Sequence, residues 1–438
     1  MLARLWFSPT ACFRPCRTRR GRSARRAAVL VTVVMATAVP MDRVQAQEST
    51  SDEQELVGRI HNATRAARKR QELSLDEQFD HAHARYAKAK KEFENATGVF
   101  FSMEASSLSQ WGTPNGGYGA VQAMFTPAID WKMFSVPEVG KGSLEFHFLA
   151  AQYWSGATGT SLGSKLGLTS PINNQPTANQ QFVQLTYTHR FPGNWLAITL
   201  GQYAFSNFDG NAYANDQQVN FIGYSLTQNG SQNYSQAGLG TYAQINPTKQ
   251  ITLAAGFQDP NDFSGSYMQF STLGRGQYAW FAYGGWSPTI DGWGRGTYSL
   301  LYYNQPGISL QPVASEGLSF SASQPIGTKW GLFLRASTAW RSSFAIQSSL
   351  AGGGVYNDPL RRSRYDQIGL AMAWNATNMS IFQGTFVRPS ETMLELYWTW
   401  SIFKTVLITP DVQLYLQPAL SPSDYAAAVF TIRLTQLF

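Results

Sequence analysis

Short stretches in which apolar and polar residues alternate recur from about residue 98 to the C-terminus, and they constrain the fold more than any other feature. The last stretch reads AVFTIRLTQLF, in which Phe430, Ile432 and Phe438 share one parity and Arg433 lies on the other. A period of two is typical of strands that have one apolar face. Each stretch is close to the ~9–11 residues that a tilted strand needs to cross a bilayer. The pattern predicts many strands that meet lipid on one face.

The composition favours a membrane barrel over a soluble sheet protein. Charged residues make up 14% of the chain and aromatic residues another 14%, whereas ordinary soluble domains carry roughly 25% charge. Mean hydropathy is nevertheless −0.24, and beyond the N-terminus no apolar run approaches the ~20 residues of a membrane helix. A chain that is polar on average can still present an apolar surface if every second residue points outward. We therefore predict an all-β fold, a transmembrane antiparallel β-barrel.

The outward face of the predicted strands is aliphatic at mid-strand and aromatic near the ends. One such face comprises Leu394, Leu396, Trp398, Trp400 and Ile402. Trp and Tyr rings favour membrane–water interfaces, whereas a soluble sheet would carry charged residues there. About 340 residues, at about 20 residues for each strand and its connection, give 16 to 18 strands. We predict a barrel of about 16 strands around a water-filled lumen, in the outer membrane of a Gram-negative cell.

Residues 1–46 form a separate, strongly basic segment. They contain nine arginines and one acidic residue, so this segment accounts for the formal net charge of +7. The arginines precede an apolar run and the sequence VQA, which ends at Ala46, and this order is typical of a cleaved secretory signal peptide. An N-terminal membrane anchor is the alternative, although the apolar run is short for a span. Because the basic residues lie in the leader, we expect no nucleic-acid partner.

Side chains suited to metal binding or catalysis are scarce. Both cysteines, Cys12 and Cys16, lie in the leader, so the exported chain would have no thiol for a disulfide or a cysteine-based metal site. Of five histidines only His147 and His189 fall in the predicted barrel, and the chain has no G-x-S-x-G motif. An outer-membrane lipase or protease would therefore have few bases to draw on. We expect no catalytic residues, no metal and no cofactor.

Residues 47–97 differ in amino-acid composition from the rest of the chain, because they are rich in Glu, Lys, Arg and Ala and contain no Pro. Their apolar residues recur at alternating steps of four and three, as in a coiled-coil seam. The positions are Leu75, Phe79, Ala82, Tyr86, Ala89 and Phe93. We predict a periplasmic helical segment, either a coiled coil or a single amphipathic helix that lies on its own protein. His81 and His83 would face different sides of this helix, which argues against a metal pair.

The inward-facing residues of a barrel decide what passes through it. Six residues flanked by lipid-type neighbours are predicted to line the pore and to bind solute: Glu145, Arg335, Glu395, Gln413, Tyr415 and Arg433. An Arg on the lipid face near the midplane would cost about 2–4 kcal/mol, so Arg335, between Leu334 and Ala336, is expected to point inward. Arg donors, Glu acceptors and aromatic faces would suit a sugar-conducting constriction. An ion pair that only makes the wall of the lumen polar, without binding solute, is an equally good interpretation.

Three stretches resemble the carbohydrate-selective porins of the OprB family. They are PTANQQFVQLTYTHRFPGNWLAITLGQYAFSNFDGNAYANDQQVNFIG, GLGTYAQINPTKQITLAAGFQDPN and ETMLELYWTWSIFKTVLITPDVQLYLQPAL. The most specific part is an acidic strand followed by TPDVQLYLQPAL, in which Glu395, Pro410, Asp411, Gln413 and Pro418 match the closing pattern of the family. The resemblance implies a 16-stranded barrel that admits sugars by diffusion, and it is compatible with a homotrimer. A Trp-Gly-Gly opening, often seen near the family's mature N-terminus, is not found, and the helical segment stands in its place.

The sequence therefore predicts an outer-membrane porin for passive diffusion of carbohydrates or other small hydrophilic solutes. The alternative is an outer-membrane component of polysaccharide export or envelope tethering, in which residues 47–97 would dock a periplasmic partner. The C-terminal Phe438 resembles the recognition signal of outer-membrane insertion machinery, although a ring that only contacts the membrane interface would explain it equally well.

Overall fold

The computed structural model describes the chain from Leu75 to Phe438, apart from residues 115–118, 261–264, 270–271, 310 and 404. The predicted signal peptide, both cysteines and the first part of the 47–97 segment lie outside the described residues. Within the described part of the chain, no helix combines the length and the hydropathy that a membrane span requires.

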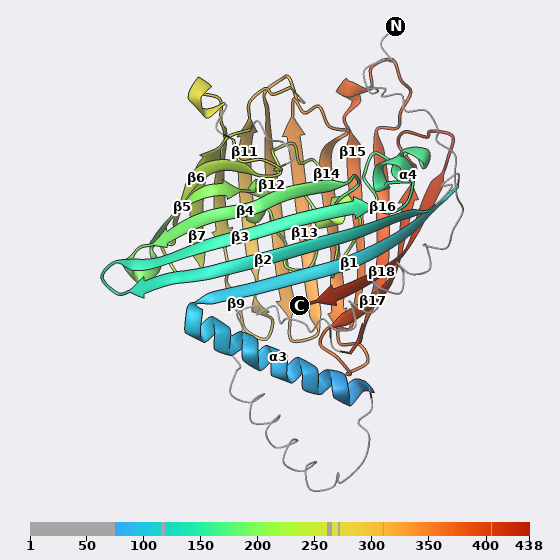
Figure 1. The fold of residues 1–438 in the computed structure, drawn as a ribbon. Helices are drawn as coiled ribbons and strands as arrows, with labels where there is room; N and C mark the ends of the chain where they lie inside the picture. The colour runs from blue at the N-terminus through green and yellow to red at the C-terminus, as the bar shows by residue number, and fades with distance from the viewer. Residues whose placement is uncertain (1–74, 115–118, 261–264, 270–271, 310, 404) are drawn as a thin grey trace, which may run out of the picture. The chain divides into compact units, whose positions relative to one another are not determined.

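Sixteen strands of the described residues close into one antiparallel barrel (Figure 1). In chain order they are β1 (Val99–Thr113), β2 (Ala120–Val136), β3 (Gly140–Tyr153), β4 (Asn179–Arg190), β5 (Leu196–Tyr203), β6 (Gly238–Ile245), β7 (Ile251–Gln258), β8 (Ala279–Trp286), β11 (Thr297–Gln305), β12 (Ser315–Ile326), β13 (Trp330–Trp340), β14 (Ile346–Asn357), β15 (Gln367–Thr377), β16 (Ser390–Ile402), β17 (Val406–Leu416) and β18 (Ala426–Leu437). Because β1 pairs with β18, the backbone groups at both ends of the sheet are paired, as lipid requires. The predicted fold class and strand number are confirmed.

The shorter elements lie between these strands or before them. They are α3 (Leu75–Thr97), α4 (Gly159–Lys165), α5 (Tyr224–Thr227), the 3-10 helices η1 (Pro192–Asn194), η2 (Phe205–Phe208), η3 (Leu273–Arg275) and η4 (Met379–Ile381), and the two-stranded sheet of β9 (Thr289–Ile290) and β10 (Gly294–Arg295).

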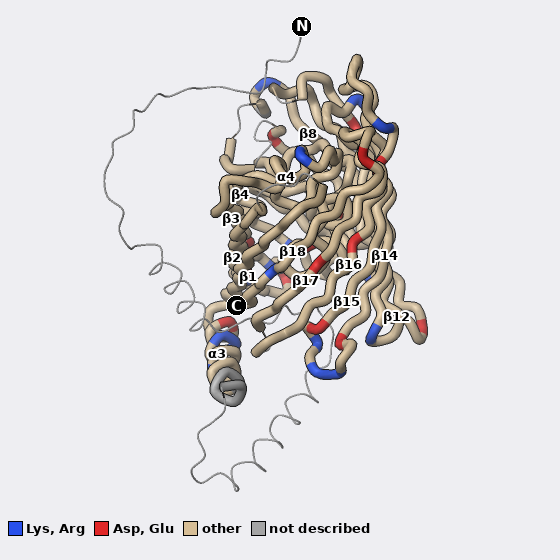
Figure 2. The backbone as a smooth tube through the Cα atoms, turned by 90° about the vertical axis from the view of Figure 1, so that its right-hand side faces the viewer, with Lys and Arg blue, Asp and Glu red and all other residues tan. Residues whose placement is uncertain are grey.

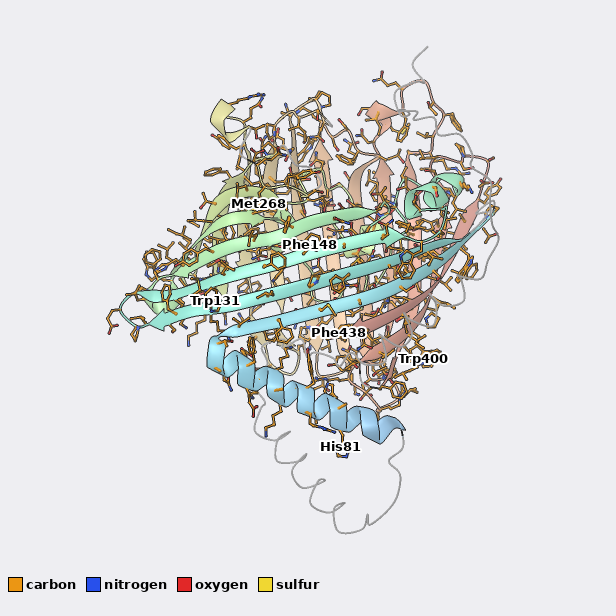
Figure 3. All side chains as sticks on the ribbon, in the orientation of Figure 1. His81, Trp131, Phe148, Met268, Trp400 and Phe438 are labelled. Atoms are coloured by element: carbon orange, nitrogen blue, oxygen red, sulfur yellow. The ribbon has the colours of Figure 1, made fainter. Side chains whose placement is uncertain are left out.

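The alternation of the sequence becomes the outer and inner faces of the barrel wall. On β18, Ile432 is 54% exposed, whereas its neighbour Arg433 is 1% exposed. On β16 the outward residues Trp398 and Trp400 pack ring against ring, with centroids 4.9 Å apart. Figure 3 labels Trp131 and Trp400, which belong to the outward-facing set. The last residue is hydrogen-bonded to β1, since the Phe438 N–H donates to the carbonyl oxygen of Met103 at 2.9 Å.

Charged side chains avoid most of the barrel wall. Figure 2 shows that many Lys, Arg, Asp and Glu residues lie toward the two ends of the barrel, where strands are joined, with fewer along the strands. This distribution is that of a barrel whose outer face meets hydrocarbon, because a charge on that face is costly.

Two long connections fold into the lumen. We call them inner connection 1 (residues 154–178, between β3 and β4) and inner connection 2 (residues 204–237, between β5 and β6). Their apolar residues, such as Leu166 and Phe221, form one buried cluster with inward residues of the wall, such as Met393. The core of this barrel therefore sits inside the lumen, on the face opposite to the lipid.

Helix α3 leads directly into β1 through Gly98 (Figure 1). Gly98 has a φ of +73°, and a Cβ at this position would lie 2.5 Å from the carbonyl oxygen of Lys132. The helix therefore ends at a residue that only glycine fits. The predicted helix is present over Leu75–Thr97, and its pairing as a coiled coil stays a prediction.

Candidate functional site

Five of the six predicted lumen residues point inward and are almost completely buried. They are Arg335 on β13, Glu395 on β16, Gln413 and Tyr415 on β17, and Arg433 on β18. Alternation positions them, because each lies between two outward-facing neighbours in its strand. Their side chains are covered by the two inner connections, and most of their hydrogen bonds reach the backbone of those connections.

Arg433 holds the middle of inner connection 2. Its Nη1 donates to the carbonyl oxygens of Gln217 and Asn220, both at 2.6 Å, and its Nη2 donates to Thr409 Oγ1 at 3.2 Å. The guanidinium group is 1% exposed. Hydrogen bonds from a charged donor to buried carbonyl groups are among the stronger ones in proteins, so Arg433 fixes this part of the connection against the wall.

Glu395 holds the next turn of the same connection with the opposite polarity. Its Oε1 accepts from the Ile222 N–H at 2.5 Å, and its Oε2 accepts from the Gly223 N–H at 2.8 Å. A Cβ on Gly223 would collide with the side chain of Met393. Glycine at this position therefore allows the backbone to approach the carboxylate closely.

Arg335 holds inner connection 2 at two points, near its start at Asp209 and beyond Gly223 at Leu226. Its Nη1 donates to the carbonyl oxygen of Leu226 at 3.1 Å, and its Nη2 donates to that of Asp209 at 3.4 Å. The Asp209 carboxylate accepts from Asn229 Nδ2 at 2.9 Å and from the Tyr234 hydroxyl at 3.2 Å. Asp209 belongs to the connection and not to a strand. Burial raises the pKa of its carboxyl group, and the nearby positive charge of Arg335 acts in the opposite direction.

Inner connection 1 is held in the same way by β16 and β17. Glu391 accepts from the N–H groups of Thr169 at 3.1 Å and Ser170 at 2.9 Å. Gln413 Nε2 donates to the carbonyl oxygen of Ile172 at 3.0 Å, and the Tyr415 hydroxyl donates to Gln413 Oε1 at 2.8 Å. Tyr415 therefore orients the amide that holds the connection.

An open cavity of about 530 Å³ lies in the lumen between the inner connections and the wall formed by β3, β4 and β6. Its lining is mostly carboxamide: Asn174, Gln175, Gln181, Gln184, Asn207, Asn215, Gln228, Gln236 and Gln244. Phe208 and Tyr242 add an aromatic pair, with ring centroids 5.0 Å apart and planes at 89°. His147 is the only titratable side chain of the lining besides Tyr242.

Glu145, the sixth predicted residue, is half-buried and contacts Gln184, which lines this cavity. Gln184 Nε2 donates to its carboxylate, and Thr186 Oγ1 donates to Glu145 Oε2 at 3.4 Å. The same Gln184 accepts from Asn207 Nδ2 at 3.0 Å. A chain of hydrogen bonds therefore runs from the barrel wall at Glu145 to inner connection 2.

Comparison with known proteins decides the family. The model of the carbohydrate-selective porin family OprB matches residues 304–438. The porin AaxA of Chlamydia abortus is 32% identical over 348 residues, which cover 78% of this chain and 77% of that protein. The chain belongs to the OprB family of carbohydrate-selective porins. The porin AaxA of Chlamydia pneumoniae is similarly related, with 32% identity over 349 residues.

The fold of this porin is also that of a solved relative. OprB of Pseudomonas putida superposes with a TM-score of 0.65 and 14% identity, covering 80% of this chain and 96% of that one. The family model and the AaxA relatives confirm the resemblance stated from the sequence, and the porin family together with the barrel fold implies the outer membrane.

Sequence reasoning missed two groups of residues in this porin. Glu391 lies on the inward face of β16, four residues before Glu395, and the same parity argument would have found it. The amides of the cavity lining carried no such signal, because many of them belong to the inner connections, which have no period. Among the residues that the structure describes, no group of three or more His, Cys, Asp or Glu is arranged to hold a metal ion.

Proposed function

We propose that this porin passes small neutral polar solutes, carbohydrates among them, through the amide-lined cavity. The observation that carries the proposal is the lining itself, in which nine of the sixteen residues are Asn or Gln and none is Lys, Arg, Asp or Glu. A carboxamide both donates and accepts, so it matches a hydroxyl group in either role. A lining without fixed charge attracts neither anions nor cations strongly.

Two further features support passage of sugars. The rings of Phe208 and Tyr242 offer apolar faces on which the C–H-rich face of a pyranose ring can pack. Glu145 adds an acceptor in contact with Gln184 of the lining, already oriented by Gln184 and Thr186.

The buried wall residues act on solute passage through the inner connections. Arg335, Glu395 and Arg433 hold inner connection 2, which contributes Asn207, Asn215, Gln228 and Gln236 to the cavity lining. Gln413 and Tyr415 hold inner connection 1. Direct contact of these five side chains with solute stays a prediction.

Conductance and swelling measurements test the proposal. Purified protein in planar bilayers is expected to give stepwise conductance, and proteoliposomes are expected to swell in neutral sugars. Gln236→Glu adds one negative charge to the lining at nearly constant volume, so it is expected to slow sugar entry and to make the pore prefer cations. Gln347→Glu, on an exposed residue at the start of β14, is the matched control. Proteoliposomes that conduct ions but do not swell in any sugar would exclude carbohydrates as solutes.

The remaining expectations concern processing and assembly. We propose that residues 1–46 are removed on export, that the porin forms a homotrimer and that it carries no catalytic centre. N-terminal sequencing of the purified protein tests the first point, and light scattering in detergent tests the second.

A further inference from the structure

Helix α3 is held against the wall of the barrel by its C-terminal half. The Lys90 ammonium group lies 4.4 Å from the ring centroid of Phe100 and 5.5 Å from that of Phe101. The rings of Phe93 and Phe101 meet edge to face, with centroids 6.2 Å apart. A salt bridge joins Glu94 to Lys132 of β2 at 3.0 Å. Three different kinds of contact therefore set where this helix lies.

The wall at this point faces lipid. Phe101 pairs in register with Ile129, which is 40% exposed on the outer face of β2. Trp131 and Met133 follow on the same strand and are also exposed. A Trp at the end of an outward-facing strand is typical of the membrane–water interface. The C-terminal half of α3 therefore touches the outward-facing surface where β1 begins and Trp131 pairs with Val99.

The side of α3 that is left exposed is basic. Arg85, Lys88 and Lys91 are exposed and three residues apart, so they share one side of the helix, and no acidic residue occurs between Arg85 and Lys91. Lys88 has one acidic neighbour, Glu92, at 3.8 Å, and both side chains are largely exposed. An exposed pair of this kind is screened by water and leaves the basic residues available to other anions.

We infer that Arg85, Lys88 and Lys91 of α3 bind the headgroups of anionic phospholipids in the leaflet at this end of the barrel. The inference goes beyond solute passage and rests on continuity and charge. The helix continues the lipid-facing surface through Phe93, and its exposed cations complement lipid phosphate. Basic residues beside an anionic membrane surface each add to binding. Long basic side chains can also lay their methylene groups on an apolar surface while the charge reaches the headgroups.

A second copy of the chain fits this surface less well. A coiled-coil partner requires an apolar stripe, and of the seam residues whose burial is described, Ala82 and Tyr86 are partly buried, which leaves Ala89 and Phe93 exposed. The exposed side would bring like charges together in a homomeric contact.

Fluorescence quenching on α3 tests the inference. Ala84, exposed beside Arg85, is replaced by a labelled cysteine in a full-length chain whose Cys12 and Cys16 are serines. The protein is reconstituted into phosphatidylcholine vesicles with or without phosphatidylglycerol, and each vesicle contains a trace of headgroup-labelled quencher lipid. Quenching is expected to increase with phosphatidylglycerol and to fall on addition of salt.

Charge variants separate a site on α3 from general attraction. R85E/K88E/K91E is expected to abolish the effect of phosphatidylglycerol, and R85Q/K88Q/K91Q is expected to weaken apparent binding roughly fivefold per residue. K141E/K249E/R295E reverses three exposed basic residues elsewhere and is expected to retain the effect. The inference would be overturned by equal quenching in the two kinds of vesicle, or by an equal loss of the phosphatidylglycerol effect in the K141E/K249E/R295E control. A fall in oligomeric mass with the α3 variants alone would also overturn it, because it would show that the basic residues act in assembly. Conductance is measured in parallel, because failure of the lipid site leaves the porin function intact.

Discussion

Arg433 on β18 and Glu395 on β16, a basic and an acidic side chain, form hydrogen bonds with neighbouring peptide groups of inner connection 2. Arg433 donates to the carbonyl oxygens of Gln217 and Asn220. Glu395 accepts from the N–H groups of Ile222 and Gly223. Both side chains are 1% exposed. Each charge is thus satisfied by backbone dipoles of the connection, so the connection and the wall stabilise one another.

Removal of Arg433 is expected to release the middle of inner connection 2. Arg433→Ala leaves the carbonyl groups of Gln217 and Asn220 without their donor and the buried Glu395 without a nearby cation, a change that costs about 3–5 kcal/mol. Single-channel recordings should show larger and noisier conductance, and the melting temperature in detergent should fall. Arg341→Ala removes an exposed cation at the end of β13 and should change neither quantity.

Gly223 is expected to tolerate no side chain. A Cβ there would collide with Met393, so Gly223→Ala should displace the connection from Glu395, lower the melting temperature and alter conductance. Met393→Ala should partly rescue the variant, because it removes the group that collides. Gly156→Ala is the control, since its Cβ meets nothing within 4 Å. Full activity and stability of Gly223→Ala would contradict the close packing described here.

The carboxyl group of Asp209 should make stability fall as pH rises. Burial raises its pKa in the folded protein, so the folded state holds a proton that the unfolded state has released above the ordinary value of about 3.9. Stability is then lost from that pH up to the raised folded pKa and is constant above it. Melting temperatures measured across this acidic range should decline less steeply for Asp209→Asn than for the unaltered protein. A steeper decline in the variant would refute the assignment.

Glu145 is expected to give the pore a weak preference for cations. It is a carboxylate that contacts Gln184 of a cavity lining without Asp or Glu, so Glu145→Gln should move the reversal potential in a salt gradient toward zero. The amide keeps a similar volume and can still accept from Thr186. Glu138→Gln, in the exposed turn between β2 and β3, should leave the potential unchanged.

The wall of this barrel could be predicted from the sequence because strand periodicity is a local property. Residues at i and i+2 share a face whatever the rest of the chain does, so the inward orientation of Arg335, Glu395 and Arg433 followed from their flanking residues alone. The closed, edge-free topology followed from the same pattern together with the requirement that lipid imposes on backbone groups. The likeness to OprB porins rested on such strands as well.

Only the tertiary structure decided what those inward charges touch. Arg433 meets carbonyl groups more than 200 positions earlier in the chain, and Glu391 meets N–H groups about as far away. Inner connections 1 and 2 have neither a helical nor a strand period, so nothing local shows that they fold inward. Their positions come from long-range hydrogen bonds and from packing inside a closed barrel. The sequence alone therefore determined which face of the wall is polar, and the tertiary structure decided that much of this face is covered by chain and that an amide-lined cavity is left open.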